Sequence, residues 1–436
     1  MVPARAFVWV KGPRPLRRRL RSEGSSVMTK APPAVRDRKV CMLAYWDSPT
    51  ALPPMFNHGV SLSADGFDVE MICLAPHAGT ASVDPHVPGL STTRLYLRSR
   101  QFFQRFLGAA PPSALAAMQW AASYFEFVVK SIAAALGARA DVYEANDLPP
   151  LLPAIVAARL RGKPVVYRAH ELWSEATPSV RFAGFWRLME RILVPKCDHV
   201  ITPEENRSRI YHDELRARRQ PMTIRNCPPY RPPAQSSRLH EELRRRGKAG
   251  STIVLYQGLI DSMRCIEEIA EASRFFDAGV VLVVMGTGFG RWADATAALA
   301  GFERVVVLPP VPYKELAPFT ASSDIGVLLY RNDCRNNYYC APNKLFEYMM
   351  MGLPVIAPNY PGMLTLVEGE GVGMCVAPDS PRAIAAAVNR LAGDPESRSQ
   401  MRANGLRLSK ARYNWADESA PLLQLYRSLA RVGAAA

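Results

Sequence analysis

Short apolar runs that alternate with helical patterns constrain the fold of this sequence more than any other feature. Five runs rich in apolar residues occur before the middle of the chain, at 39–46, 68–76, 141–147, 164–171 and 197–203. Each is followed by a helical pattern or a turn. Such runs are typical of parallel strands that helices cover on both faces. The first half of the sequence is therefore predicted to be a doubly wound α/β domain.

The rhythm breaks between Asn226 and Gly250 and then restarts. The break contains NCPPYRPPAQSSR and the charged stretch HEELRRRGKAG, a composition expected of a linker. Six further apolar runs follow, at 251–258, 279–288, 304–310, 323–330, 353–358 and 373–378. A second doubly wound sheet is the economical interpretation, and 436 residues suit two or three domains. Because ligands bind outside the carboxyl ends of parallel strands, two such domains can share one cleft.

Positive charge is concentrated at the N-terminus. The formal net charge is +15, and residues 1–38 hold ten Lys or Arg against two acidic residues, a net of +8. This tail lacks the long apolar stretch of a secretory signal and is predicted to be disordered. Its arginines also suit a transit peptide, and Met28 is an alternative start. No recognition motif accompanies the charge, so nucleic acid is not an expected partner.

The eight cysteines are scattered along the chain. They form no CxxC pair, and none has a histidine at metal-binding spacing. This pattern indicates a reducing compartment and argues against a zinc site.

Two stretches bear on membrane contact. The most apolar one, 107–129, contains two prolines, Gln119 and Glu126, so no convincing membrane span is expected and a soluble helix is predicted there. The stretch RLYLRSRQFFQRFLG, 94–108, alternates Arg with Tyr, Phe and Leu. It suits contact with anionic lipid head groups at a membrane surface, and equally a basic surface helix with a buried aromatic face.

One carboxylate and one ammonium stand in the otherwise apolar stretch PNKLFEYMMMGLPVIA, which the polar segment NNYYCA precedes. Pro342 suits the first position of a helix, and Gly352 suits the left-handed position after its end. The start of this helix would expose the N–H groups of Asn343, Lys344 and Leu345. Together with the positive end of the helix dipole and the Lys344 charge, these donors predict an anion site for a phosphate.

Glu347 lies one and a half turns into the predicted helix. At the helix flank its carboxylate can accept two hydrogen bonds from a vicinal diol such as a ribose. Tyr338 and Tyr339 precede the helix and can border the same ligand, so the arrangement indicates a nucleotide. The alternative is that Lys344 and Glu347 form an i, i+3 surface pair, which typically contributes about 0.2–0.5 kcal/mol. The apolar neighbours make a solvated face less favourable.

The segment PNKLFEYMMMGLPVIA resembles the donor-site segment of bacterial family 4 glycosyltransferases of the GT-B fold. DVYEANDLPPLLPAIVAARLRGKPVVYRAHELWSE is similar to the N-domain segment of that family that ends in His-Glu, and VLYQGLIDSMRCIEEI to its C-domain glycine loop. The resemblance covers nearly all of the chain after Lys39. It implies two Rossmann-like doubly wound parallel-sheet domains that face each other across a cleft. It also implies transfer of a sugar from a nucleotide donor with retention at the anomeric carbon.

The resemblance assigns roles to the segments of the chain. Residues 39–229 are implied to form an acceptor-binding N-terminal domain, 230–250 a linker, and 251–412 a nucleotide-sugar-binding C-terminal domain. The last segment, 413–436, is implied to cross back to the N-terminal domain as a helix. Its amphipathic pattern at 416–432 agrees with a helix.

Carried over by position, Glu347 matches the second Glu of the family's Glu-x7-Glu motif and is implied to hold the donor ribose. Asn343 and Lys344 match positions whose backbone N–H groups meet the diphosphate. Gly258 matches the glycine that lets the backbone approach the donor, and Arg264 the basic residue that neutralises the diphosphate.

On the N-domain side, His170 matches the histidine that reaches the transferred sugar. Val311 lies in the loop that usually contacts the base through its backbone. The implied catalytic residues are His170, Arg264 and Glu347. The implied donor-binding residues are Gly258, Arg264, Val311, Tyr339, Asn343, Lys344, Leu345 and Glu347.

Three positions depart from the family pattern. Tyr339 stands where the first Glu of Glu-x7-Glu is expected, which leaves the contact to the sugar ring unassigned. Leu259 replaces an arginine that often follows the glycine, and Cys265 replaces the glycine after the basic residue. Arg264, helped by Lys344, is then the main cation that offsets the diphosphate.

The implied enzyme needs no metal ion and no cofactor besides its UDP-sugar or GDP-sugar donor. The acceptor is implied to be a glycan or a lipid-linked molecule in envelope or exopolysaccharide synthesis. The expected location is the cytoplasm, with peripheral contact at the inner face of the plasma membrane through 94–108 as an open alternative.

Other functions compete with this interpretation. A non-catalytic sugar-nucleotide-binding protein and a GT-B sugar-nucleotide epimerase would bind the same donor. The sequence GTGFG, 286–290, follows a predicted strand and precedes a helix, as the glycine loop of an NAD- or S-adenosylmethionine-dependent enzyme does. The next strand ends in Pro309 and Pro310 and lacks the acidic residue that an NAD site requires.

Overall fold

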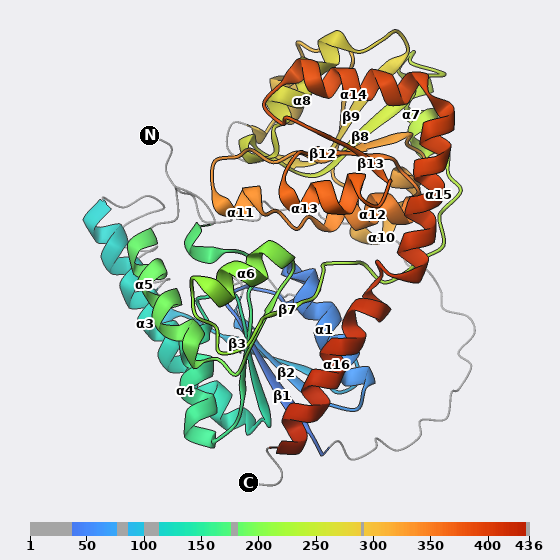
Figure 1. Ribbon diagram of the computed structural model, residues 1–436. Helices are drawn as coiled ribbons and strands as arrows, with labels where there is room; N and C mark the ends of the chain where they lie inside the picture. The colour runs from blue at the N-terminus through green and yellow to red at the C-terminus, as the bar shows by residue number, and fades with distance from the viewer. Residues whose placement is uncertain (1–36, 76–85, 100–112, 176–181, 289–291, 433–436) are drawn as a thin grey trace, which may run out of the picture.

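The computed structural model describes residues 37–75, 86–99, 113–175, 182–288 and 292–432. Figure 1 shows two α/β units, with the N-terminal unit below and the C-terminal unit above. The predicted disorder of the tail, its transit-peptide character and the alternative start at Met28 concern residues outside this part of the chain, apart from Asp37 and Arg38.

The N-terminal sheet has seven parallel strands in the order β3-β2-β1-β4-β5-β6-β7. The order reverses between β1 and β4, as in a doubly wound sheet. The strands are β1 (Lys39–Ala44), β2 (Asp68–Leu74), β3 (Leu90–Leu95), β4 (Val142–Asn146), β5 (Val165–Arg168), β6 (His199–Thr202) and β7 (Met222–Thr223). The helices are α1 (Pro53–Ala64), α3 (Ser113–Ala138), α4 (Leu151–Arg161), α5 (Ala183–Leu193) and α6 (Glu205–Asp213), with 3₁₀ turns at Pro49–Ala51, Trp173–Glu175 and Val194–Lys196.

The C-terminal sheet repeats this topology with six parallel strands in the order β10-β9-β8-β11-β12-β13. Its strands are β8 (Thr252–Ile260), β9 (Val280–Gly288), β10 (Val305–Leu308), β11 (Ile325–Val327), β12 (Val355–Pro358) and β13 (Gly373–Val376). Its helices are α7 (Arg238–Arg245), α8 (Ile266–Ala272), α9 (Ala295–Ala298), α10 (Tyr313–Ala321), α11 (Arg335–Tyr338), α12 (Asn343–Met351), α13 (Pro361–Met363), α14 (Pro381–Gly393) and α15 (Pro395–Ala411). Short 3₁₀ turns lie at Ser262–Arg264 and Ser273–Phe275, a π-helical turn lies at Leu364–Glu368, and α16 (Trp415–Val432) ends the described chain. The predicted α/β class with two doubly wound parallel sheets is confirmed.

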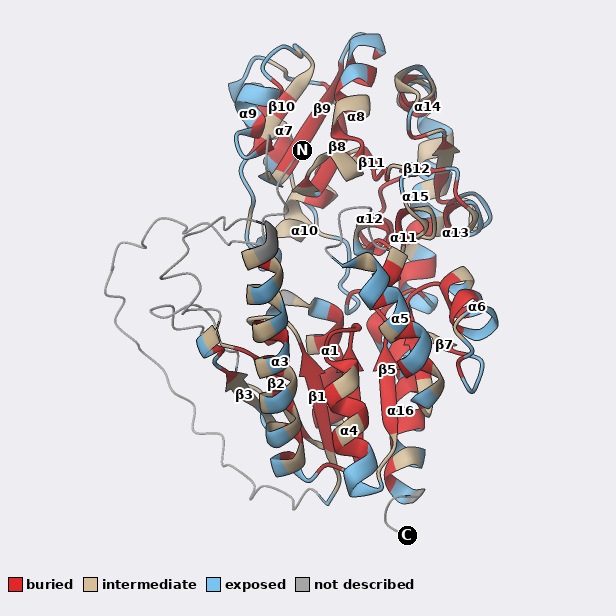
Figure 2. Ribbon diagram, turned by 90° about the vertical axis from the view of Figure 1, so that its left-hand side faces the viewer, coloured by how far each residue is buried: buried red, intermediate tan, exposed pale blue. Residues whose placement is uncertain are grey.

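Both faces of each sheet are buried, as the apolar runs predict. Along β1, Cys41 and Leu43 belong to the core under α3 and α4, while Val40 and Met42 belong to the core under α1 and α16. Successive side chains of a strand point to opposite faces, so a strand covered on both sides must be apolar throughout. Figure 2 shows the central strands coloured as buried.

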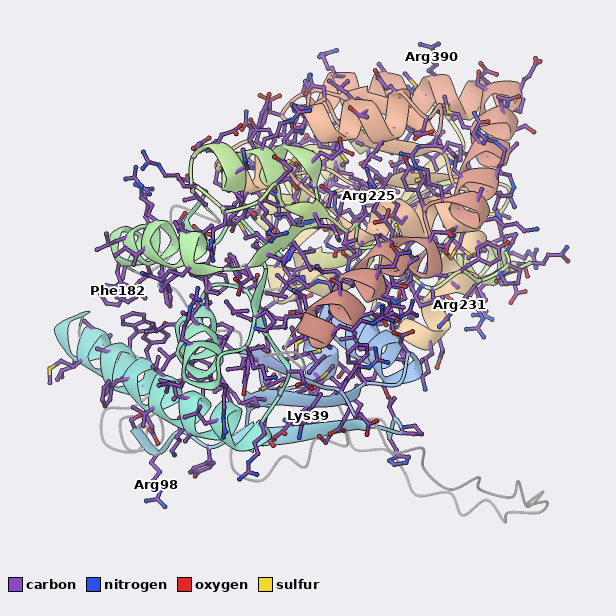
Figure 3. The ribbon with its side chains drawn as sticks, turned by 60° about the horizontal axis from the view of Figure 1, so that its bottom comes forward. Lys39, Arg98, Phe182, Arg225, Arg231 and Arg390 are labelled. Carbon is purple, nitrogen blue, oxygen red and sulfur yellow. The ribbon has the colours of Figure 1, made fainter. Side chains whose placement is uncertain are left out.

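The start of the stretch 94–108 is a strand, not part of the surface helix that the sequence leaves as an alternative. Arg94 and Leu95 lie in strand β3, a strand that the sequence pattern did not reveal. The Arg94 Nη1 donates to the Asp47 carbonyl at 2.6 Å, and the exposed Arg98 projects from the surface in Figure 3. Residues 100–112 lie outside the described part of the chain. The helix is therefore wrong for 94–95, because pairing with β2 satisfies the backbone of this segment.

Helix α3 covers most of the stretch 107–129, for which the sequence predicts a helix and no convincing membrane span. Its stretch Leu115–Ala138 is long and apolar enough to cross a membrane by length and composition, with a mean hydropathy of 1.2. A third of that stretch, 33%, is buried in the protein. In this structure α3 packs on α4 and on strands β1, β2 and β3, so it forms part of a helical layer of the N-terminal unit.

The glycines of GTGFG have a packing explanation. Gly286 and Gly288 lie within strand β9, and Gly286 pairs with Gly258 of β8. A Cβ at Gly286 would lie 1.7 Å from the Gly258 carbonyl oxygen, and one at Gly288 would lie 1.6 Å from the Trp292 carbonyl oxygen. These two glycines therefore allow close approach of backbones, which accounts for them without a cofactor loop. Phe289 and Gly290 lie outside the described residues.

The last helix joins the two units. After α15, which packs on α12 of the C-terminal unit, α16 runs down the N-terminal unit. Leu422, Leu425 and Tyr426 of α16 are buried in the same core as β1 and α1. The Trp415 Nε1 donates to Ser61 Oγ at 2.8 Å, and the Tyr426 hydroxyl donates to the buried Glu144 carboxylate. The C-terminal helix thus contributes to the N-terminal core.

Shortening Leu422 to alanine tests this contribution. The side chain is fully buried, so Leu422→Ala should lower the free energy of unfolding by about 2–5 kcal/mol. Urea unfolding measures the change, with Gln424→Ala on the exposed face of the same helix as the control. Equal stabilities of the two variants would contradict the packing of α16 described above.

Candidate functional site

The second sheet reverses its strand order between β8 and β11, and the candidate site lies beyond the carboxyl ends of these strands. Gly258, in the last part of β8, has φ +120°, a conformation that side-chain-bearing residues rarely adopt. A Cβ there would lie 3.4 Å from the Lys344 Nζ. The glycine therefore lets the backbone of β8 lie close to the Lys344 side chain at the start of α12.

Helix α12 begins one residue later than predicted. Pro342 is its N-cap residue with extended dihedrals, and Asn343 is the first helical residue. Gly352 ends the helix with φ +73°, as predicted. No side chain caps the N-terminus, and the first turn contains no acidic residue. The Leu345 N–H donates to the Pro342 carbonyl at 3.3 Å and its side chain is buried, so Asn343 and Lys344 are better placed to meet an anion.

Arg264 lies in the short turn Ser262–Arg264 after β8. Its backbone N–H donates to Asp261 Oδ1 at 3.1 Å, and its guanidinium lies 4.2 Å from the centre of the Tyr330 ring. Burial alone disfavours the charge, but Tyr330, Tyr256 and Asp261 outweigh burial and raise the Arg264 pKa. Arg264 is therefore a permanent cation at this edge of the sheet.

Lys344 is a second cation at the same place, but a titratable one. Its Nζ lies 4.2 Å from the centre of the Tyr256 ring. Burial, followed by the nearby Arg264 charge, lowers the Lys344 pKa to about 7, although Glu347 and Asp261 act in the opposite direction. A bound anion would reverse this balance, because it would favour the ammonium form.

Glu347 is half-buried one turn into α12. The Gln257 Nε2 donates to its Oε2 at 2.8 Å, and Thr320 Oγ1 donates to the Gln257 Oε1 at 2.8 Å, which fixes the orientation of the amide. The hydroxyl of Tyr313, a half-exposed residue, also hydrogen-bonds to the carboxylate. Burial raises the Glu347 pKa against the effect of these donors and of Lys344. The carboxylate is thus held by donors at the edge of the cleft rather than paired only with Lys344.

The remaining predicted residues have different surroundings. Val311 lies in the loop between β10 and α10, two residues before Tyr313, and so borders the same region as Glu347. The ring of Tyr339 packs against the core of the N-terminal unit, and its centre lies 5.0 Å from that of Tyr338. Tyr339 therefore lies at the boundary between the two units.

His170 follows β5 and faces the C-terminal unit from the other side. Its backbone N–H donates to Asp147 Oδ1 at 3.0 Å, and its Nε2 lies 3.0 Å from Asn146 Oδ1. An amide oxygen only accepts, so this contact places the proton on Nε2 and leaves Nδ1 as an acceptor. Burial, followed by the Arg168 charge, holds the His170 pKa well below its usual value, and the ring is neutral at pH 7.

Leu259 and Cys265, the two residues that depart from the family pattern after Gly258, are compatible with the local backbone conformation. Cys265 has φ +53°, the left-handed conformation in which the family has glycine, and its side chain is buried. Leu259 continues strand β8 and pairs with Thr287. Neither residue adds charge to the site.

Sequence reasoning missed three residues of this region: Gln257, Tyr313 and Arg207. Gln257 directly precedes Gly258, so its position at the end of β8 was a usable signal. Tyr313 contacts Glu347, and Arg207 donates to the backbone carbonyls of His170 and Tyr339, through tertiary contacts that no local pattern reveals. Within the described ranges, no group of three or more His, Cys, Asp or Glu side chains is arranged to hold a metal ion.

Comparison with known proteins identifies the family and the fold. Residues 252–394 match the model of the family described as glycosyl transferases group 1, and residues 59–227 match that of the glycosyl transferase 4-like domain. The two matches cover the two sheet units in turn. The chain belongs to the group 1 glycosyltransferases and has their GT-B fold.

Two curated relatives are D-inositol 3-phosphate glycosyltransferases. The protein from Xylanimonas cellulosilytica is 26% identical over 182 residues, which cover 40% of this chain and 42% of the relative. The protein from Thermobispora bispora is 30% identical over 144 residues, 32% of each chain. The matched part of this chain thus spans less than half the length of either relative.

Solved structures show the same fold over most of the chain. Sucrose-phosphate synthase from Thermosynechococcus elongatus has a TM-score of 0.68 and 19% identity, covering 91% of this chain and 100% of that one. HepE from Anabaena, solved in complex with UDP and glucose, has a TM-score of 0.66 and 16% identity, covering 90% and 100%.

The low pKa of Lys344 predicts a pH effect on anion binding. The protonated form prevails below about pH 7 and binds a diphosphate better, so the affinity should fall by up to roughly tenfold per unit above pH 7. Calorimetric titration with UDP and with GDP between pH 7 and 8.5 measures this change. The Lys344→Gln variant should bind more weakly and lose this pH dependence. A wild-type affinity that is constant over this range would exclude Lys344 as a charged ligand.

Proposed function

We propose that this protein transfers a sugar from a UDP-sugar or GDP-sugar to a glycan or lipid-linked acceptor, with retention at the anomeric carbon. The observation that carries the proposal is the convergence of Arg264, Lys344 and Glu347 beside Gly258 and the uncapped start of α12. Two cations and free N–H groups suit a diphosphate, and a carboxylate a few ångströms further along suits the hydroxyls of a ribose.

In this proposal the donor ribose displaces a protein contact at Glu347. A cavity of roughly 30 Å³ borders Glu347, Asn343 and Tyr313, with Asn57 and Trp415 on its other side. Such a space admits about one water molecule, whereas ligand sites typically measure about 300–1,000 Å³. The ribose hydroxyls would take the place of the Tyr313 hydroxyl on Glu347, and Gln257 would continue to orient the carboxylate.

The chemistry depends on stabilising the leaving nucleoside diphosphate. Its developing negative charge would meet Arg264, Lys344 and the N–H groups of α12, which are already in position before reaction. These groups supply positive charge without a metal ion, so we propose a metal-independent reaction. In a retaining transfer the acceptor hydroxyl attacks from the face that the phosphate leaves, and a phosphate oxygen takes its proton.

His170 would meet the transferred sugar from the opposite side of the cleft. Its neutral imidazole has an accepting Nδ1, which suits a hydrogen bond from a sugar hydroxyl. A neutral ring also avoids placing a second proton where the anomeric carbon gains positive charge.

Binding and turnover in EDTA test the proposed function. UDP or GDP should bind the wild type, and Glu347→Ala should lose about 1–3 kcal/mol of that binding, while Glu315→Ala on the exposed side of α10 should not. Incubation with the matching sugar nucleotide should release the diphosphate, and NMR should show retention in the transferred sugar. Binding without any release would favour a non-catalytic binding protein, and isomerised donor would favour an epimerase.

The acceptor and location also belong to this proposal. We place the protein in the cytoplasm, in peripheral contact with the inner membrane surface, where lipid-linked acceptors of envelope polysaccharides are available. Support comes from α3 and α5, which expose Met118, Phe125, Val129, Phe182, Phe185, Leu188 and Ile192. Phe182, labelled in Figure 3, lies 4.7 Å from the Trp120 ring of α3, so the two helices present adjoining apolar surface. The exposed Arg187 and Arg191 can meet anionic head groups.

Vesicle flotation tests the membrane contact. The protein should bind vesicles of phosphatidylethanolamine and phosphatidylglycerol, and the double variant Phe125→Ser, Leu188→Ser should bind roughly tenfold more weakly. The control variant Phe275→Ser, Leu364→Ser removes two exposed apolar side chains of the same residue types from the C-terminal unit, at 43% and 40% exposure against 70% and 58%, and should bind normally. Equal binding of both variants would remove α3 and α5 from the contact.

A further inference from the structure

Arg207 connects the two units at a place that the proposed reaction depends on. It lies in the first turn of α6, and Glu204, the N-cap residue, accepts its backbone N–H at 2.9 Å. Although α6 belongs to the N-terminal unit, it lies directly below α11 and α13 of the C-terminal unit in Figure 1. The Arg207 side chain is only 3% exposed. An arginine buried between two units requires an explanation, because burying a charge is costly.

Its guanidinium binds four acceptors from both units. The Nη1 donates to the His170 carbonyl at 2.7 Å, and Nη2 lies 3.4 Å from the Glu171 carboxylate. The Nε donates to the Tyr339 carbonyl at 2.7 Å, and Nη2 donates to the Asn336 carbonyl at 3.0 Å. Only the planar fork of arginine offers donors in several fixed directions, which lysine does not reproduce.

A second connection runs parallel to the first. The Leu172 N–H donates to Asn336 Oδ1 at 2.8 Å, and Asn336 is buried. The ring of Tyr339 packs against the core of the N-terminal unit. The loop 170–172 and the segment 336–339 are therefore joined by side-chain, backbone and apolar contacts. This arrangement also gives Tyr339 a function in place of the expected glutamate.

The two joined segments lead directly to the candidate site. His170 belongs to one, and the other ends three residues before Pro342, the N-cap of α12. If the units separated, the bonds from Arg207 to Asn336 and Tyr339 would break, whereas its bond to His170 lies within one unit. These contacts therefore exist only when the units are together.

We propose that Arg207 is a positioning residue that joins the His170 loop to the donor-binding segment, so that His170 faces the sugar only in the closed arrangement. This inference rests on the proposed transfer reaction and deepens it. Arg207 acts through the His170 carbonyl and the Tyr339 carbonyl rather than by touching the donor. It should therefore affect turnover much more than donor affinity, since reacting groups that are misplaced by about 1 Å can lose roughly 100-fold in rate.

Arg207→Met and Arg207→Lys test the proposal in the full-length protein. Both should lower kcat by about 100-fold, while the Kd for UDP or GDP in calorimetry changes by less than about threefold. Two control variants accompany this test. Arg209→Met changes an exposed arginine of the same helix, and Arg335→Met removes the exposed interdomain pair with Glu214, at 2.6 and 2.8 Å, without touching the His170 loop. Both controls should keep kcat within about threefold of the wild type.

Several outcomes would overturn the inference. An unchanged kcat in Arg207→Met would do so, and so would a loss of donor affinity equal to the loss of kcat, or full rescue by lysine. If Arg207→Met does not fold, as judged by circular dichroism, Asn336→Ala removes only the parallel bond and should lower kcat by about tenfold with an unchanged Kd.

A failure of the proposed function has a different signature, namely wild-type protein that neither binds a nucleoside diphosphate nor turns over a sugar nucleotide. In that case small-angle scattering of the folded Arg207 variant still tests the interdomain role. A larger radius of gyration than that of Arg209→Met supports it, and an equal radius overturns it.

Discussion

Coverage of both faces of two parallel sheets is the constraint from which the rest of this structure follows. Helices bury the strands on each side, so most strand residues are apolar, with exceptions such as the buried Glu144 of β4, and polar side chains gather at the strand ends and in the loops that follow them. In a parallel sheet all carboxyl ends lie at one edge, and the strand order reverses once in each sheet. Gly258 and α12 on one side, and His170 on the other, occupy these edges.

Two charged groups of the candidate site, Lys344 and Glu347, are held where their surroundings disfavour the charge, which reduces the stability of the protein. Arg264 and Lys344 are like charges held close together, and the low Lys344 pKa reflects burial first and that repulsion second. Glu347 is held in surroundings that disfavour its own charge. An anion and a pair of hydroxyl groups would relieve both effects at once. A perturbed cation next to a perturbed carboxylate is the arrangement expected of the proposed donor site rather than of an i, i+3 surface pair.

Much of this could be predicted from the sequence because the relevant signals are local. The β1 run 39–46 and the β12 run 353–358 were recognised because buried parallel strands are apolar throughout, and Gly352 because a helix end requires a left-handed residue. Strand β3 escaped notice because it lies at the sheet edge, where Thr and Ser replace apolar residues. The glycines of GTGFG left a cofactor loop open as an alternative, because close backbone approach to Gly258 and to Trp292 requires glycine, as a phosphate-binding loop also does.

The parts of the site that the sequence did not reveal are those that depend on the two units meeting. Tyr339 looked like a lost glutamate because its partner, the core of the N-terminal unit, is more than a hundred residues away in sequence. Arg207 looked like any arginine in a helical pattern, yet its hydrogen bonds span 129 and 132 residues to Asn336 and Tyr339. Local sequence patterns reflect the interactions that each unit requires in order to fold. The contacts between the units depend instead on how two folded domains lie relative to each other. At such a contact, a residue such as Tyr339 can replace a ligand-binding residue and orient the domains.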